Sequence, residues 1–411
     1  MKKIRNFILL FIILLMPIFF LTGCSKDTSI ENLAYVIAIG IDKGENNLLK
    51  LSLQFATPES ASSKNGNTSS SSESTITTAD CSSIDSGINL INSYISKKIN
   101  LAHCKVVVFS EELAAEGIGD EIYTLINNMQ MRPDCNVIVS KCDASDFLNN
   151  SKPVLVNLVA RYYEIVLSSG EYSGYSYAVK LNDFYCSLKD ACVQPVAILS
   201  GINTDKTHYI DPNSNYIDID GSYKAGEALV KDKNNLEILG LAVFNQDKLV
   251  GELNGLQTLS YLLIEGKLQD CTINIPDPLI QDSMISLALK QSKSPKIKVN
   301  MVNNSPLINI DIYLSADISS LSSSADYTNS ESINDINHYA NSYLESHINE
   351  YLYKVTKNFK SDINGFGRQL LSRYATFQDF EQLHWLENYK NSFFIVNVHT
   401  SVKGSSVIFK N

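Results

Sequence analysis

The pattern that most constrains the fold lies in the last third of the chain. Apolar and polar residues alternate over residues 297–301 and 308–318, which is typical of strands with one buried face. Apolar residues then recur every three or four positions over residues 333–359, for about seven helical turns. After a break at Gly365 and Gly367, we predict a second helix at 370–389 and strands at 394–402 and 407–409. This order predicts an antiparallel sheet with two helices on one face.

Strands and helices also alternate in the first part of the chain. We predict strands at residues 33–42, 49–55, 105–110, 136–140 and 196–199, and helices at 83–98, 113–129, 154–168 and 181–189. A hairpin at 236–253 and a helix at 256–264 form a smaller unit. The predicted fold class is therefore α+β, with three mixed α/β domains at 24–203, 204–285 and 286–411. The serine-rich stretch 58–74 has little to bury and is predicted to be a surface loop of the first domain.

The N-terminus carries the signal of an exported lipoprotein. A basic head and an apolar run over residues 7–21 lead to the sequence Leu21-Thr22-Gly23-Cys24. We expect residues 1–23 to be removed as a signal peptide and the thiol of Cys24 to carry diacylglycerol. The alternative is an uncleaved membrane anchor, although the run is short for a span of roughly 20 residues and contains Pro17. Two or three acyl chains make a stable anchor.

Charge and cysteine content narrow the classes of partner. The net charge is −10, and we find no dense Lys/Arg cluster after the signal, which argues against a nucleic-acid partner. Cys24 is one of eight cysteines, and the other seven are spread thinly, unlike a disulfide scaffold. We expect mostly buried free thiols and leave a Cys186–Cys192 disulfide open as an alternative.

The chain contains no recognisable catalytic or metal-binding motif. His338 and His347 fall on opposite faces of the predicted long helix, so they do not form a metal pair. We interpret Asp42 as a turn former rather than an acid, and Trp385 as a core residue. Gly365-Phe366-Gly367 is interpreted as a helix break, because a phosphate loop would need a lysine that is missing. We therefore expect no catalytic residues, no metal and no cofactor, and a binding or scaffolding protein rather than an enzyme.

Four motifs follow the lipoprotein signal in a fixed order. They are residues 30–44 (IENLAYVIAIGIDKG), 103–109 (HCKVVVF), 240–251 (GLAVF and DKLVG) and 362–367 (DINGFG). In this order the chain resembles the Ger(x)C lipoproteins, the C subunits of spore germinant receptors. Two departures from the family pattern are Ser25-Lys26-Asp27 after the lipid cysteine and the serine-rich stretch.

The resemblance implies a non-enzymatic receptor subunit with three mixed α/β domains. It implies a lipid anchor on the outer face of the spore inner membrane, and two membrane-spanning partners, the A and B subunits. The complex would sense nutrients and start germination. The alternative is a lipid-anchored extracytoplasmic solute-binding or hydrolytic protein, for which the predicted C-terminal element order and the missing nucleophile–base pair give no support.

Overall fold

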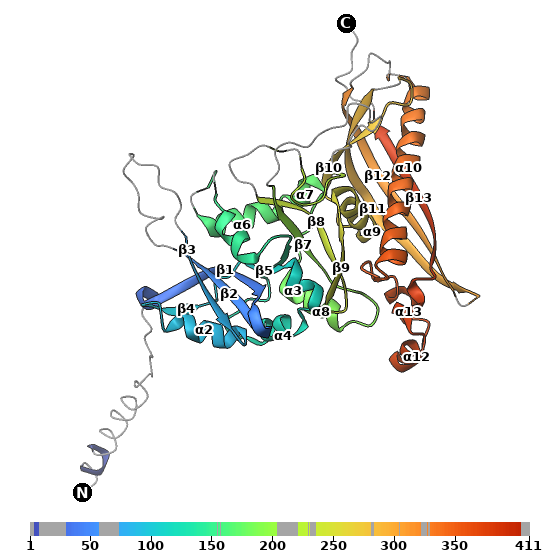
Figure 1. The fold of residues 1–411 in the computed structure, drawn as a ribbon. Coiled ribbons are helices and arrows are strands. Elements are labelled where there is room, and N and C mark those ends of the chain that lie inside the picture. Colours follow the sequence, from blue (N-terminus) through green and yellow to red (C-terminus); the bar gives the residue numbers. More distant parts are fainter. Residues whose placement is uncertain are drawn as a thin grey trace.

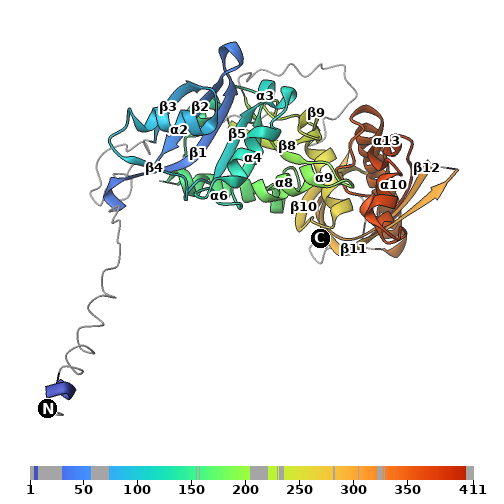
Figure 2. The same ribbon diagram turned by 90° about the horizontal axis from the view of Figure 1, so that it is seen from below.

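The structure is a computed structural model in which two β-sheets lie side by side in an elongated molecule (Figures 1 and 2). It describes residues 4–7, 30–56, 74–153, 155–156, 158–203, 221–228, 230, 236–280, 283–303, 305–321, 327 and 329–403. The predicted signal peptide with Leu21, Thr22, Gly23 and Cys24, most of the serine-rich loop and the predicted strand at 407–409 lie outside these residues. Across the described part of the chain, the α+β fold class is confirmed.

The first sheet has nine strands, in the order β3-β2-β1-β5-β6-β7-β8-β9, with β4 paired to β1. Its strands are β1 (Leu33–Lys43), β2 (Leu49–Phe55), β3 (Thr75–Cys81), β4 (Lys98–Asn100), β5 (Val106–Ser110), β6 (Asn136–Ser140), β7 (Val196–Ile202), β8 (Leu236–Asn245) and β9 (Lys248–Leu253). The central strands β1, β5, β6 and β7 are parallel, and the outer pairs are antiparallel. Helices cover both faces of the centre, which explains why β5 and β6 are buried along their whole length.

Seven helices accompany this sheet, and their bounds differ in places from the predicted ones. They are α2 (Ile84–Asn92), α3 (Glu111–Glu116), α4 (Gly119–Asn127), α5 (Ala144–Asn150), α6 (Val159–Ser168), α7 (Gly170–Ser173) and α8 (Leu181–Lys189). The helix predicted at 83–98 ends early, because the chain leaves it to form β4 beside β1. The helix predicted at 113–129 is two helices, separated at Gly117, whose φ of 127° is unfavourable for residues with a side chain.

The second sheet has four strands in the order β10-β11-β12-β13. These are β10 (Asp270–Pro276), β11 (Met284–Val302), β12 (Ser305–Leu321) and β13 (Phe393–Lys403). The prediction of a wholly antiparallel sheet is wrong in one pairing, because β13 runs parallel to β12. The long helix α10 (Ser330–Tyr353) carries the chain back along the sheet before β13 begins, so β13 starts at the same end as β12 (Figure 1).

Polar side chains of α10 cap the backbone of the edge strand β13. The N–H groups of Val398, Thr400 and Val402 donate to side-chain oxygens of Glu345, Asn341 and Asn337 at 2.8, 2.8 and 2.7 Å. The spacings match, because four helical residues rise about 6 Å and two strand residues rise about 6.6 Å. We call this set of hydrogen bonds the polar ladder.

The segment that follows α10 differs more from the predicted secondary structure than any other described part of the chain. A π-helical turn (Lys354–Asn358) follows α10 directly, so the long helix ends before Gly365 is reached. The single helix predicted at 370–389 is instead three short ones, α11 (Arg368–Leu371), α12 (Phe377–Glu381) and α13 (Trp385–Tyr389). Thr376 starts α12 with a capping box, and His384 has a φ of 47°, which prevents α12 and α13 from continuing into one another.

The predicted hairpin 236–253 forms as β8 and β9, and the helix predicted at 256–264 is α9 (Gly255–Glu265). The hairpin extends the first sheet through the antiparallel pair β7–β8. Helix α9 packs against β8 and β9 of the first sheet and also against α10 and β11. The division into three domains stays a prediction.

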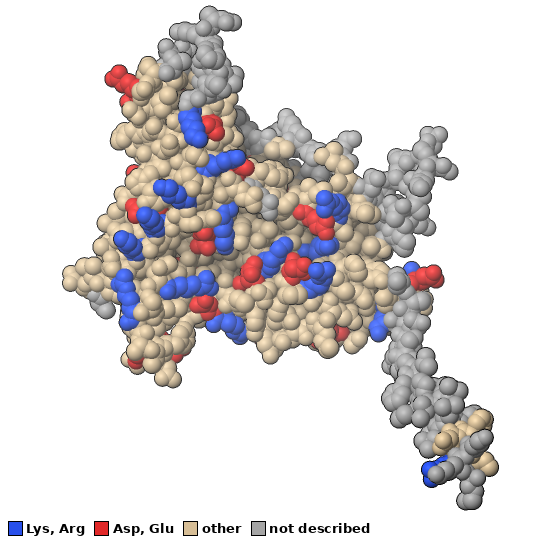
Figure 3. Space-filling model, turned by 180° about the vertical axis from the view of Figure 1, so that it is seen from behind, with Lys and Arg blue, Asp and Glu red and all other residues tan. Residues whose placement is uncertain are grey.

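One face of the second sheet is covered by α9 and α10, and the other is exposed. Lys and Arg side chains gather over this sheet on the left of Figure 3, and β11 contributes the exposed Lys290, Lys293, Lys296 and Lys298. The ammonium groups of Lys293 and Lys296 lie 5.4 and 5.6 Å from the ring centre of Tyr313. The sequence interpretation missed this basic patch.

Candidate functional site

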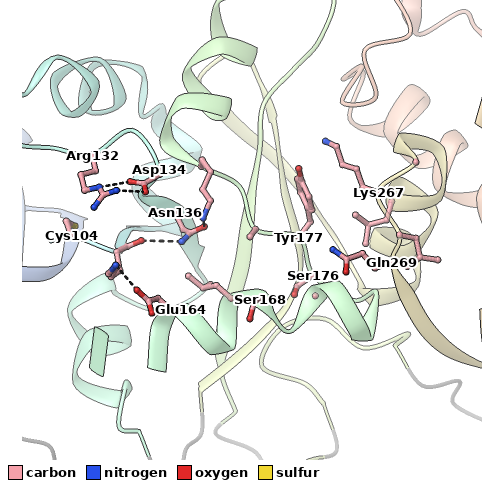
Figure 4. Close-up of a pocket in the computed structure, with 18 of the residues that line it drawn as sticks. Cys104, Arg132, Asp134, Asn136, Glu164, Ser168, Ser176, Tyr177, Lys267 and Gln269 are labelled. Carbon is pink, nitrogen blue, oxygen red and sulfur yellow. Dashed lines mark hydrogen bonds and ion pairs between the residues drawn. The ribbon is translucent and has the colours of Figure 1, made fainter. Parts of the chain in front are cut away.

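A cleft of about 720 Å³ lies beside the first sheet, in the size range of small-ligand sites. One wall comes from the segments before β5 and β6 and from the last turns of α6 (Figure 4). The facing wall comes from residues 176–178 and from the connection between α9 and β10. Since β10 is the first strand of the second sheet, the cleft lies where the two sheets are joined.

The cleft is shaped by two glycines. An added Cβ at Gly170 would lie 2.1 Å from the carbonyl oxygen of Ser176, so only glycine allows these two segments to approach so closely. Gly266 ends α9 in the left-handed conformation, with a φ of 69°. The next residue, Lys267, therefore lies in the wall of the cleft, with its Nζ 4.6 Å from the ring centre of Tyr177.

Two ion pairs line the wall formed by the first sheet. The Nζ atom of Lys105 lies 2.7 Å from Oε1 of Glu164, and Arg132 donates two hydrogen bonds of 3.1 Å to the Asp134 carboxylate. Lys105, and after it Arg161, lowers the pKa of the Glu164 carboxyl. Both carboxylates are therefore neutralised by cations beside them.

Lys180 has a different environment from the two cations in these ion pairs. Its ammonium donates to Oδ1 of Asn136 at 2.9 Å, while the Asn136 amide donates to the Lys105 carbonyl at 3.3 Å. Within the described part of the chain, no carboxylate lies within ion-pair distance of Lys180. The cleft thus contains one cation that is positioned by a neutral amide.

The thiols and the imidazole near the cleft give no sign of catalysis. The Sγ atoms of Cys104 and Cys135 lie 3.7 Å apart, both buried, and burial raises the pKa of Cys135 well above its usual value. A protonated, buried thiol is a poor nucleophile. His103 is exposed and packs edge-on against Tyr35, with ring centres 4.7 Å apart.

A second cluster joins the two sheets through the segment after α10, residues 354–368, which we call the junction segment. The buried Asp362 carboxylate accepts hydrogen bonds from the backbone N–H groups of Phe366 and Gly367 and from Nε1 of Trp385, at 3.1, 3.0 and 2.8 Å. Trp385 is therefore a core residue, as predicted. The N–H groups that a phosphate loop would offer are already bound by the chain's own carboxylate.

The junction segment also bonds directly to the first sheet. Ser361 Oγ donates to the Phe244 carbonyl at 2.6 Å, and the Gln194 N–H donates to the Asp362 carbonyl at 2.9 Å. Arg368 forms an ion pair of 2.7 Å with Asp190. These bonds fix the second sheet against the first.

Asp42 has a different role from the predicted one. Its buried carboxylate accepts hydrogen bonds from the N–H groups of Ala144 and Ser145, at 2.5 and 3.1 Å, in the first turn of α5. Burial raises its pKa, and these two bonds oppose the increase. Asp42 therefore caps a helix distant in sequence, and the turn-former interpretation is wrong.

The lipid-attachment residue Cys24 and the preceding Leu21, Thr22 and Gly23 lie outside the described residues, so their role stays a prediction. No group of three His, Cys, Asp or Glu side chains suited to a metal is found in the described ranges. Within the same ranges, no helix combines the length and the apolar character needed to cross a bilayer. The seven cysteines after Cys24 are free thiols, so Cys186 and Cys192 are not bonded to each other.

Sequence reasoning missed the cleft, whose residues come from five separate stretches of the chain. The motif at 103–109, with His103, Cys104 and Lys105, drew attention to only one of these stretches. Nothing in the sequence indicates that Lys180 and Lys267 line the same cleft.

Two family models match the chain, one after the other. Residues 26–199 match the spore germination protein N-terminal domain, and residues 239–406 match the C-terminal domain described as spore germination B3/GerAC like. Together these matches span most of the chain and both sheets.

Comparisons with individual proteins point to the same family. The chain is 22% identical to YfkR of Bacillus subtilis (strain 168) over 395 residues, covering 95% of this chain and 94% of that protein. It is 22% identical to spore germination protein KC of the same organism over 381 residues, covering 89% and 88%. The crystal structure of the GerBC protein aligns with a TM-score of 0.50 at 16% identity, covering 89% of this chain and 96% of that chain. At this identity the structural match speaks for the fold alone.

Proposed function

Because this chain belongs to the Ger(x)C family of spore germination proteins, we propose that it is the lipid-anchored C subunit of a nutrient-germinant receptor. Family membership places its role in spore germination. The proposal adds that the chain acts without catalysis, through contacts with the membrane-spanning A and B subunits on the outer face of the spore inner membrane.

One observation supports the proposal most: the two matched family domains follow one another in a single chain, after the predicted lipoprotein signal. In this proposal a lipid on Cys24 supplies the membrane anchor. The two sheets also differ in strand number and in how helices cover them, whereas a two-lobed solute-binding protein would be built from two similar α/β lobes.

Deleting the gene and scoring germination on single nutrients tests the receptor role. We expect the response to at least one nutrient to be lost and to return when the wild-type gene is restored. Germination unchanged on every nutrient, in a strain without a second copy of such a gene, would refute the proposal.

The Cys24→Ala variant tests the anchor separately. We expect the variant protein to fold but to leave the membrane fraction, while Cys186→Ala, a matched change at an exposed cysteine, stays membrane-bound. Full retention of Cys24→Ala would show that partner subunits, and not lipid, hold the protein. Cross-linking after co-purification would then identify the contact surfaces.

A further inference from the structure

The charge balance of the cleft differs from that of the whole chain. Four cationic side chains line it, against two carboxylates, in a chain whose net charge is −10. The four are Lys105, Arg132, Lys180 and Lys267. Glu164 and Asp134 are paired with Lys105 and Arg132, and Lys267 has Glu265 beside it, so the uncompensated positive charge of the lining lies on Lys180.

Lys180 has hydrogen-bonding capacity to spare. An ammonium carries three N–H donors, and only the bond to Asn136 uses one of them within the described part of the chain. Asn136 is buried and is itself held by the Lys105 carbonyl, so it fixes the position of the ammonium. A donor positioned in this way beside a cavity is suited to an acceptor oxygen from outside the chain.

Lys267 offers a second cation from the facing wall, beside Tyr177 (Figure 4). Its Nζ forms an ion pair with Glu265, at 3.4 Å from Oε2, and its side chain is still 40% exposed, so a ligand can reach the ammonium. Lys267 follows α9 directly and precedes β10. A ligand that bonds to both lysines would therefore join the first sheet to the start of the second.

We propose that this cleft binds a small anion, with carboxylate or phosphate oxygens bonded to Lys180 and Lys267. The cavity volume suits a small molecule, and the ammonium groups match such oxygens in charge and in hydrogen bonding. The inference goes beyond the receptor role and rests on the cleft alone, so its failure would leave the germination experiment unaffected.

Isothermal titration calorimetry on the full chain in detergent tests the proposal. The probes are sodium phosphate and sodium succinate, each compared with sodium chloride at the same ionic strength, because salt screens such contacts. We expect saturable binding of at least one probe. Saturation by phosphate alone would identify a phosphate ligand, and saturation by succinate alone a carboxylate; either result supports the site.

Three variants locate the binding. Lys180→Gln should weaken it by about tenfold or more, the expected loss for one charge-assisted hydrogen bond, and Lys180→Arg should retain most of it. Lys267→Gln should weaken it severalfold. Lys189→Gln removes the same charge from the exposed last residue of α8, the helix that begins directly after Lys180, and should leave binding unchanged.

Two results would overturn the inference. One is the absence of saturable binding of either probe to the wild-type chain at millimolar concentrations. The other is an equal effect of Lys180→Gln and Lys189→Gln, which would indicate non-specific attraction. Circular dichroism melting of each unliganded variant shows whether a loss of binding reflects a loss of folding.

Discussion

At the scale of single residues, burial decides how the cysteines react. Cys186 is exposed and Cys142 half-buried, whereas the other five described thiols are buried. Burial also raises the pKa of Cys192 and of Cys271 to about 12, so their reactive thiolate is scarce at neutral pH.

We therefore predict that, of the seven described thiols, Cys186 alone reacts rapidly with a maleimide in the folded protein. Cys186→Ser should remove the fast phase, while Cys81→Ser should leave it intact. Mass spectrometry of labelled peptides at successive times measures this, and denatured protein shows full labelling as a control. A fast phase that survives Cys186→Ser would contradict the exposure described above.

Asp362 is the residue whose titration should affect stability. Burial raises its pKa to about 7, against the opposing effect of its three hydrogen bonds. The folded protein therefore holds a proton there that the unfolded chain releases above its usual pKa of 3.8. This contribution to stability is complete below about pH 4 and is lost as the pH rises through 7, with a slope of up to ~1.4 kcal/mol per pH unit.

The Asp362→Asn variant cannot titrate, so it should lack this contribution to the pH dependence. We predict that the free energy of unfolding of the wild type falls relative to that of the variant between pH 5 and pH 8. Urea unfolding of both proteins at several pH values measures the difference. A difference that stays constant with pH would show that Asp362 keeps one protonation state throughout.

At the scale of elements, local sequence patterns predicted where strands and helices lie better than they predicted which strands pair and in which direction. The bounds predicted for β2, β6 and α8 agree with the structure, because alternation and helical spacing act over a few residues. The parallel pairing of β13 depends on the length of α10, and the split between α12 and α13 depends on Thr376 and His384. The cleft depends on contacts between stretches far apart, for which spacing along the chain gives no signal.

The polar ladder yields a prediction at this scale. Asn341→Ala removes the acceptor for the Thr400 N–H and should lower the free energy of unfolding by about 1–2 kcal/mol. Asn349→Ala is the matched control on the same helix, since the Asn349 side chain is exposed and bonds only to the Glu345 carbonyl. Hydrogen exchange should also speed up at the Thr400 amide in the first variant alone. Equal losses from both variants would mean that helix propensity, and not the ladder, is being measured.

At the scale of the whole molecule, the junction segment makes the two sheets one unit. Lys354 Nζ donates to the Glu252 carbonyl at 2.7 Å, and Phe359 packs directly on Gly251 of β9. An added Cβ at Gly251 would lie 2.1 Å from Cε1 of the Phe359 ring. Glycine at this position therefore permits the close contact between the sheets.

We predict that Gly251→Ala pushes Phe359 away and separates the unfolding of the two sheets. Calorimetry should show one transition for the wild type and a broadened or double transition for the variant. The double variant with Phe359→Ala makes room for the added methyl group, so its destabilisation should be smaller than the sum of the two single changes. Strict additivity would show that the clash is relieved in another way.

The parallel pairing of β12 with β13 has a consequence for how the protein folds. Strands β10, β11 and β12 follow one another and can pair before β13 is in place, but β12 then presents an open edge. That edge stays available to other chains until α10, the junction segment and β13 have all followed. A chain that ends before residue 393 would therefore keep the edge of β12 unpaired and open to association with other chains.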